Sequence, residues 1–285
     1  MSKQIYFLGF YTTGDGAPDL TNVANEVKVK LSKYFTDMFI YNKETLKKLP
    51  DSNDICNVFD EPTDMTYFPY AHTMGYYDWK SFIVDYTLKQ IPENSILLYH
   101  DINFEKYPNY WQSDWNNIYD ICEYFLNKNE SDIWAKFELN DFFLKKSMKT
   151  YAIDKVFIDP KQNDVIKNSL QINSSQVILR NTTFSKEFAK EWLEYSKDWD
   201  ITHPTPNPNR HPESELTGCP DQDAMQCAIY KRIFDGRLKP TFPIYGLNWR
   251  VLRLDKIKFE MKGMMCETGP YELINEELIK YFKNK

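Results

Sequence analysis

The chain has 285 residues, of which 42% are apolar and 27% charged, as is typical of a globular protein. Its 41 acids outnumber its 35 bases, and the net charge of −6 at pH 7 argues against a protein that binds nucleic acid through phosphate contacts. No apolar run approaches the roughly 20 residues of a membrane-spanning helix, and the first residues lack the pattern of a secretory signal. We therefore expect no nucleic-acid partner and no integral membrane segment.

The cysteines are odd in number, scattered along the chain, and form no Cys-x-x-Cys pair. This spacing disfavours a zinc ribbon and a redox dithiol. Unpaired cysteines are typical of a reducing compartment, so we expect a cytoplasmic location. The five residues are Cys56, Cys122, Cys219, Cys227 and Cys266.

The N-terminal part of the chain shows the pattern of a strand, a helix and a second strand. Residues 4–11 are rich in aromatic and β-branched side chains, which predicts a strand. Between 19 and 34 the apolar residues recur at spacings of three and four, which predicts a helix. Residues 38–41 then form a short second strand, and such a unit places its two strands parallel.

Strands and helices continue to alternate, which predicts an α/β fold. No internal repeat and no Gly- or Ser-rich linker divides the sequence, so we expect a single domain over residues 1–285. The predicted helices are 75–90, 115–127, 185–199 with Ser185 as N-cap, and 221–234, and the predicted strands are 95–100 and 175–180.

One predicted loop is long and rich in proline. Residues 203–220 contain five prolines, and a loop of about 18 residues is unusual inside a compact domain. We interpret it as a functional loop or a lid.

Polar residues follow three of the predicted strands. In open α/β sheets, ligands bind outside the carboxyl ends of the strands. We therefore expect residues 12–16, 101–103 and 181–183 to lie at the edge of the sheet where chemistry takes place.

The strongest local signal is an acid at the end of a buried strand. Asp101 and Asn103 follow the strand 95–100 and are two residues apart, so that both side chains can point the same way. Two such oxygen ligands can bind a divalent cation, which would neutralise a diphosphate leaving group. The ordinary interpretation is that Asp101 caps a turn and that Asn103 is a loop residue.

Several segments together are similar to a known pattern. Residues 75–80 (Gly-Tyr-Tyr-Asp-Trp-Lys) precede a hydrophobic strand that ends in Tyr99-His100-Asp101, and the order resembles GT-A type nucleotide-diphospho-sugar glycosyltransferases. That family carries a Gly-Tyr-Trp-x-Trp-Lys-Pro helix and a strand that ends in Tyr-x-Asp. Further likeness lies in residues 134–136, 171–175, 188–195 and 219–224, so that it covers most of residues 4–235.

The sequence departs from the family pattern at three positions. Tyr77 and Ser81 replace the usual Trp and Pro, and Asn103 stands where a second Asp is common. A metal site built on Asp101 and Asn103 would therefore have one carboxylate fewer than is usual in the family.

The resemblance implies a Rossmann-like mixed sheet flanked by helices, with a nucleotide-sugar half at about 1–105 and an acceptor half at about 106–285.

The resemblance also implies Mn²⁺ or Mg²⁺ as cofactor, with Asp101, Asn103 and His211 as metal ligands. His211, like His203, is otherwise a polar surface residue of the long loop, and we interpret His72 and His100 as packing residues. The donor-binding residues it implies are Phe10, Tyr11, Thr12, Lys80, Asp101, Ile102, Asn103, Gln171 and Gln222.

The catalytic base stays open among several acids. Asp223 and Asp221 begin the predicted helix 221–234, where a capping role is the ordinary explanation. Asp78 and Glu213 are rivals, as is Glu215 in the same loop. Any of them could take the proton from an attacking sugar hydroxyl, and an enzyme that retains the anomeric configuration needs no such base.

We therefore expect a glycosyltransferase that moves a sugar from a nucleotide-diphosphate donor, a UDP- or GDP-sugar, to a saccharide hydroxyl during glycan assembly. The alternative is a carbohydrate- or nucleotide-binding module of the same fold without catalysis. A nucleotidyltransferase is disfavoured because residues 12–16 contain no basic side chain. The motifs of serine hydrolases, zincins and P-loop proteins do not occur.

Overall fold

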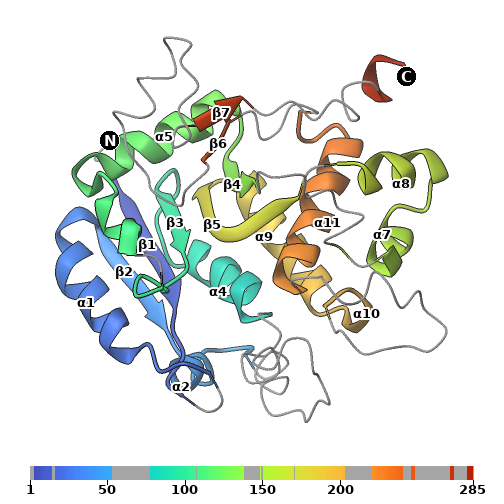
Figure 1. Cartoon of the computed structure of the whole chain (residues 1–285). Coiled ribbons are helices and arrows are strands. Elements are labelled where there is room, and N and C mark those ends of the chain that lie inside the picture. The colour runs from blue at the N-terminus through green and yellow to red at the C-terminus, as the bar shows by residue number, and fades with distance from the viewer. Residues whose placement is uncertain are drawn as a thin grey trace.

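Five strands of the computed structural model form one mixed sheet, in the order β2-β1-β3-β5-β4 (Figure 1). The structure describes residues 3–14, 17–52, 78–106, 108–137, 148, 150–169, 171–202, 220–239, 245–247, 270–272 and 281–284. The strands are β1 (Ile5–Phe10), β2 (Asp37–Tyr41), β3 (Ile96–His100), β4 (Ile133–Phe137) and β5 (Ile172–Arg180). The predicted α/β class, with a mixed sheet flanked by helices, is confirmed.

The predicted strand-helix-strand unit is present at the N-terminus. Strands β1 and β2 are parallel, and α1 (Thr21–Leu31) with a short 3-10 turn (Ser32–Tyr34) connects them. Val27 and Leu31 are among the four α1 residues that are buried, at the spacing that places them on one face of a helix. Strand β1 also pairs in parallel with β3, so β1 lies between two parallel neighbours.

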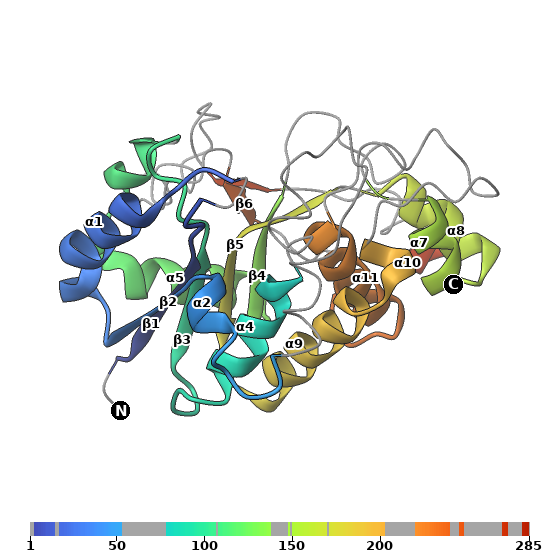
Figure 2. The same cartoon turned by 90° about the horizontal axis from the view of Figure 1, so that it is seen from below.

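Two layers of helices cover the sheet, because its strands are apolar on both faces. Phe7 and Leu98 point into the core on one face, beneath α1 and α5 (Ile118–Lys128). Leu8 and Leu97 alternate with them and point into the other core, beneath α4 (Trp79–Leu88), α9 (Thr183–Ser196) and α11 (Pro220–Phe234). Figure 2 shows the sheet between these two layers.

Strand β5 runs antiparallel to β3, and this corrects one prediction. In the register of the pair, Arg180 lies opposite Ile96 and Gln176 opposite His100. Residues 181–183 therefore lie where β3 begins, at the edge opposite to Asp101, and the prediction that they line the active edge is wrong. Asn181 instead holds the turn before β3, since its side-chain amide donates to the carbonyl oxygen of Ile91 at 2.8 Å.

The N-cap of α9 also differs from the prediction. Thr182, rather than Ser185, has extended backbone angles and accepts a hydrogen bond from the backbone N–H of Ser185. Ser185 stands at the third helical position, where its hydroxyl accepts from the backbone N–H of Thr182 and completes a capping box.

The remaining elements include one strand and two helices that the sequence did not predict, namely β4, α7 (Thr150–Val156) and α8 (Pro160–Lys167). The short elements are α2 (Lys43–Leu46), α10 (Trp199–Thr202), the 3-10 turns Pro108–Gln112 and Trp115–Asn117, and a separate antiparallel pair of β6 (Tyr245–Leu247) and β7 (Pro270–Glu272).

Within the described ranges, no helix has the length and apolarity that crossing a bilayer would require. Cys122 and Cys227 are buried free thiols, and burial raises the pKa of both. The other three cysteines lie outside the described residues.

Candidate functional site

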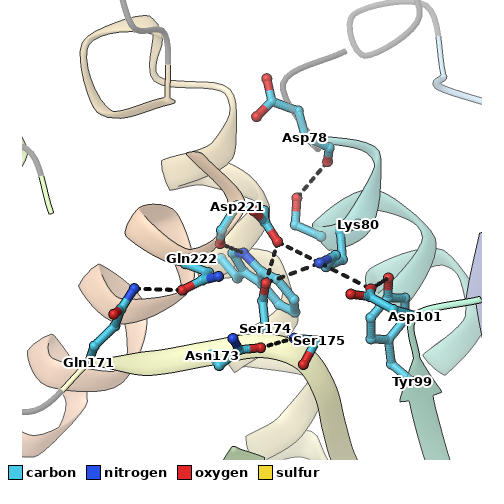
Figure 3. Close-up of polar contacts among 12 residues, drawn as sticks. Asp78, Lys80, Tyr99, Asp101, Gln171, Asn173, Ser174, Ser175, Asp221 and Gln222 are labelled. Carbon is cyan, nitrogen blue, oxygen red and sulfur yellow. Dashed lines mark hydrogen bonds and ion pairs between the residues drawn. The ribbon is translucent and has the colours of Figure 1, made fainter. Parts of the chain in front are cut away.

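A buried lysine connects three elements at the carboxyl end of β3. Lys80 lies in the first turn of α4 and is 4% exposed. Its Nζ lies 2.5 Å from Oδ2 of Asp221 at the start of α11, 3.0 Å from Oγ of Ser174 in β5, and 3.4 Å from Oδ1 of Asp101 after β3 (Figure 3). The Ser174 hydroxyl also bonds Oδ2 of Asp221. Lysine is rarely buried unless it is paired, and these contacts supply its partners.

The charges of this cluster do not cancel. Burial lowers the pKa of Lys80, but the nearby carboxylates of Asp101 and Asp221 more than offset it, so the pKa lies above the ordinary lysine value. Lys80 therefore stays positively charged at neutral pH. One ammonium between two carboxylates leaves the cluster with a net charge of −1 when both acids are ionised.

Asp101 is the part of the cluster that a ligand can reach. Its side chain is 25% exposed, against 5% for Lys80 and 6% for Asp221. The Tyr99 hydroxyl donates to Oδ1 of Asp101 at 2.6 Å, the same oxygen that Lys80 approaches. Both contacts are made by Oδ1, and the partly exposed carboxylate lines the cavity described next.

A cavity of about 180 Å³ adjoins Asp101 at the ends of β1 and β3. The aromatic rings of Phe10 and Trp79 stack in its wall with centroids 3.9 Å apart. Six of the nine predicted donor-binding residues line it, and Leu20 and Trp79 are additions that the sequence did not single out. The lining consists of Phe10, Thr12, Leu20, Trp79, Lys80, Asp101, Ile102 and Asn103.

The other three predicted donor-binding residues are not part of this lining. The Gln171 amide donates to Oε1 of Gln222 at 2.8 Å, so these two side chains connect the start of β5 with α11. The Tyr11 hydroxyl accepts from the side-chain amide of Asn42 at 2.8 Å, next to β2.

Asn103 offers an oxygen that suits a cation. Its Oδ1 is buried and accepts no hydrogen bond from any residue that the structure describes. An orphaned buried acceptor is costly, and water, an ion or a ligand can satisfy it. Asp101 lines the same cavity, so two side chains with oxygen ligands of the kind that Mg²⁺ and Mn²⁺ prefer are present.

The third predicted metal ligand, His211, lies outside the described residues. Within the part of the chain that is described, no group of three or more His, Cys, Asp or Glu side chains is arranged to hold a metal ion. Asp101 and Asn103 would therefore supply only two of the ligands of a divalent cation.

The candidate bases are placed differently from one another. Asp221 belongs to the cluster, and its carbonyl oxygen accepts from Nε1 of Trp192 at 3.2 Å. Asp223 is fully buried in α11 near Cys227, whose pKa is raised first by burial and then by this acid. Asp78 is 2% exposed, and its carboxylate points away from Lys80 (Figure 3). None of these three lines the cavity, and Glu213, like Glu215, lies outside the described residues.

Ser174 and Ser175 were not predicted as site residues. They belong to a polar run, Asn173-Ser174-Ser175, that occupies buried positions of β5. Consecutive polar residues inside a buried strand need polar partners. The run stands directly before the apolar part of the strand in the sequence, so it was a signal that could have indicated these site residues.

The fold and the cluster together define an α/β protein with a charged, partly aromatic cavity at the carboxyl ends of two parallel strands. No protein-family model and no curated protein sequence matches the chain. Among solved structures, the chain is similar to the apo form of mouse xyloside xylosyltransferase 1. The two share 10% sequence identity, with a TM-score of 0.41, over 82% of this chain and 83% of that one. Similarity of this degree does not bear on the site or its chemistry.

Proposed function

We propose that the protein is a metal-dependent glycosyltransferase of GT-A type, which transfers a sugar from a UDP- or GDP-sugar to a saccharide hydroxyl during glycan assembly in the cytoplasm. The observation that carries the proposal is that Asp101, with its partly exposed carboxylate, and Asn103, with its orphaned Oδ1, line one cavity. The sequence resemblance to that family independently directs attention to the same two residues.

The charges around the cavity explain why a cation is part of the proposal. The Lys80–Asp101–Asp221 cluster has a net charge of −1 when both acids are ionised, and its only ammonium lies closest to Asp221. A diphosphate would be repelled by such a cluster, since like charges in a poorly solvated site cost free energy. A bound Mn²⁺ or Mg²⁺ would reverse the local charge and stabilise the departing diphosphate.

The chain's own residues would bind and orient the donor. Asp101 and Asn103 would hold the cation, while Tyr99 and Lys80 fix the Asp101 carboxylate through Oδ1. The stacked rings of Phe10 and Trp79 offer an apolar wall for the base or the ribose. At about 180 Å³ the cavity is smaller than the roughly 300–1,000 Å³ of typical ligand sites, so these residues would hold one end of the donor.

The reaction breaks the bond between the anomeric carbon and the diphosphate oxygen. The acceptor hydroxyl oxygen forms the new bond to that carbon and loses its proton. Asp221, Asp223, Asp78 and Glu213 all stay candidates for the group that takes this proton, and the diphosphate itself would take it in a retaining reaction.

A thermal-shift panel tests the proposal. UDP, GDP and their hexose conjugates are each added to the full chain with and without Mn²⁺. A ligand at about 100 times its Kd stabilises the folded state by about 2.7 kcal/mol, so the right donor with Mn²⁺ should raise the Tm by several degrees. No shift with any nucleotide, in either condition, would overturn the proposal.

The second candidate is a binding module of the same fold without catalysis. It is favoured by Asn103 in place of an acid and by the absence of the candidate bases Asp78, Asp221 and Asp223 from the cavity lining. The release of UDP or GDP from the stabilising donor distinguishes the two. A module would bind the donor and release no nucleotide at any Mn²⁺ concentration or with any saccharide acceptor.

A further inference from the structure

His100 is buried at the end of β3, immediately before Asp101. It has no exposed surface, and its ring contacts the rings of Tyr110 and Phe104 with centroids 4.6 and 5.1 Å apart. The sequence predicts a packing residue here, and these contacts confirm that His100 packs. The ring also makes polar contacts that packing does not require.

Both ring nitrogens of His100 lie at hydrogen-bond distance from polar atoms. Nδ1 is 2.8 Å from the carbonyl oxygen of Asp101, and Nε2 is 2.8 Å from the side-chain nitrogen of Gln176. A carbonyl oxygen only accepts, so Nδ1 must carry the proton. With the Gln176 amide nitrogen facing the ring, Nε2 accepts from it, and the two contacts fit the tautomer that carries its proton on Nδ1.

The position of Asp101 explains why its carbonyl needs this donor. His100 and Gln176 form the last residue pair of the β3–β5 ladder, so Asp101 is the first residue beyond it. Its N–H still donates to the carbonyl oxygen of Ser175 at 3.0 Å. His100 therefore holds the other side of the same residue, at a point where strand pairing has ended.

We propose that His100 is a positioning residue, which fixes the backbone of Asp101 so that the carboxylate is presented to the cavity. Four contacts then restrain Asp101: the Ser175 carbonyl and the His100 ring contact its backbone, and Tyr99 and Lys80 contact its carboxylate. The consequence for cation binding rests on the proposed function, whereas the restraint of the Asp101 backbone does not.

Two substitutions separate the polar contact from the packing. In His100→Asn the side-chain amide nitrogen can take the place of Nδ1 and donate to the Asp101 carbonyl. In His100→Gln the longer side chain places its amide near Nε2, next to Gln176, and leaves the Asp101 carbonyl without a donor. Both replace the ring, so both lose its contacts with Tyr110 and Phe104, and near-UV circular dichroism and Tm establish that both fold.

The first readout is the hydrogen-exchange rate of the Asp101 amide, measured by NMR on the full deuterated chain. We expect exchange at least tenfold faster than in the wild type for His100→Gln, and a rate near that of the wild type for His100→Asn. Equal rates at Asp101 in the two variants would overturn the positioning role, whatever the protein's function.

The second readout is the affinity for Mn²⁺ alone, from the electron paramagnetic resonance signal of the free ion. Substitutions behind a metal ligand typically cost about 10–100-fold in affinity, so we expect such a loss in His100→Gln and recovery of most of it in His100→Asn. Equal affinities in the two variants contradict the link from His100 to cation binding. A wild type that binds no Mn²⁺ contradicts the proposed metal site, while the exchange result still decides the positioning role.

Discussion

Lys80 and Asp221 form a buried ion pair of 2.5 Å across a sequence separation of 141 residues. The pair ties the first turn of α4 to the first turn of α11 on one face of the sheet. Asp221 also lies where the positive end of the α11 dipole favours an acid. The cluster that fixes Asp101 therefore depends on a contact between two helices that are far apart in the sequence.

Removal of the ammonium should strongly destabilise the protein. Lys80→Met leaves Asp221 buried without its cation, and breaking such a pair typically costs about 3–5 kcal/mol in the free energy of unfolding. The double variant Lys80→Met/Asp221→Leu should recover most of that loss, because no buried charge is left. Urea denaturation measures both.

A surface pair provides the control for this experiment. Lys190 and Glu194 form an exposed i,i+4 pair in α9, and exposed pairs contribute little to stability. Lys190→Met should leave the urea midpoint nearly unchanged. If Lys80→Met behaved in the same way, the cluster would not contribute to the stability of the fold.

The ion pair also predicts how stability depends on pH. The pKa of Lys80 is above the ordinary value of 10.5 in the folded protein, so the folded state binds the proton more tightly than the unfolded state. The stabilisation is fully present below about pH 10.5 and is lost as the pH rises through the folded pKa. The free energy of unfolding of the wild type should fall more steeply above pH 10.5 than that of Lys80→Met/Asp221→Leu, and parallel curves would contradict the raised pKa.

Local patterns in the sequence were sufficient to predict the first three strands and the position of Asp101 at the end of the third. Strands β1 and β3 are short apolar runs bounded by turn residues, and Asp101 directly follows one of them. The direction of β5 could not be predicted in this way, because a strand pattern is the same for parallel and antiparallel pairing. That ambiguity alone caused residues 181–183 to be placed at the wrong edge.

Which residues contact one another in the site depends on the tertiary structure, and no local sequence pattern predicts it. The sequence indicated Lys80 and Asp221 separately, but their pairing spans 141 residues. Ser174 enters the cluster only because β5 is antiparallel to β3, which brings the first half of β5 beside Asp101. Strand β4 was not predicted, and the register shift in its pairing with β5 between Ala135 and Lys136 is likewise a property of the pair of strands and not of either one alone.

The exposed acid of the cluster should be necessary for cation binding but not for folding. Asp101→Asn removes the carboxylate while it preserves the shape of the side chain, and we expect the Mn²⁺-dependent thermal shift with UDP or GDP to disappear while the Tm without ligand changes little. Asp120→Asn is the matched control, since Asp120 pairs with Lys3 on the surface of α5. An equal ligand shift in both variants would exclude Asp101 as a metal ligand.

The Asn at position 103 should limit the affinity for the cation. Asn103→Asp adds a second carboxylate at the same distance from the backbone, so Mn²⁺ should bind more tightly, by about tenfold if the new charge contributes about 1.4 kcal/mol. Asn103→Leu has a similar size and no oxygen, and it should bind Mn²⁺ more weakly than the wild type. Isothermal titration calorimetry with Mn²⁺ ranks the three proteins, and any other order contradicts coordination by residue 103.

Gly9 should control the shape of the cavity although it does not line it. A Cβ atom built on Gly9 would lie 2.7 Å from Cδ1 and 2.8 Å from Cγ1 of Ile102, both closer than side chains tolerate. Ile102 lines the cavity, so Gly9→Ala should displace it and weaken the binding of UDP or GDP with Mn²⁺ by about tenfold, or about 1.4 kcal/mol. The double variant Gly9→Ala/Ile102→Ala removes both clashing atoms of Ile102 and should bind more tightly than Gly9→Ala alone.

Gly236→Ala is a control for general destabilisation, because Gly236 has a φ of +74° and lies outside the cavity lining. It should lower the Tm and leave the nucleotide affinity unchanged. Equal affinities in Gly9→Ala and Gly9→Ala/Ile102→Ala would show that Gly9 does not act on the cavity through Ile102.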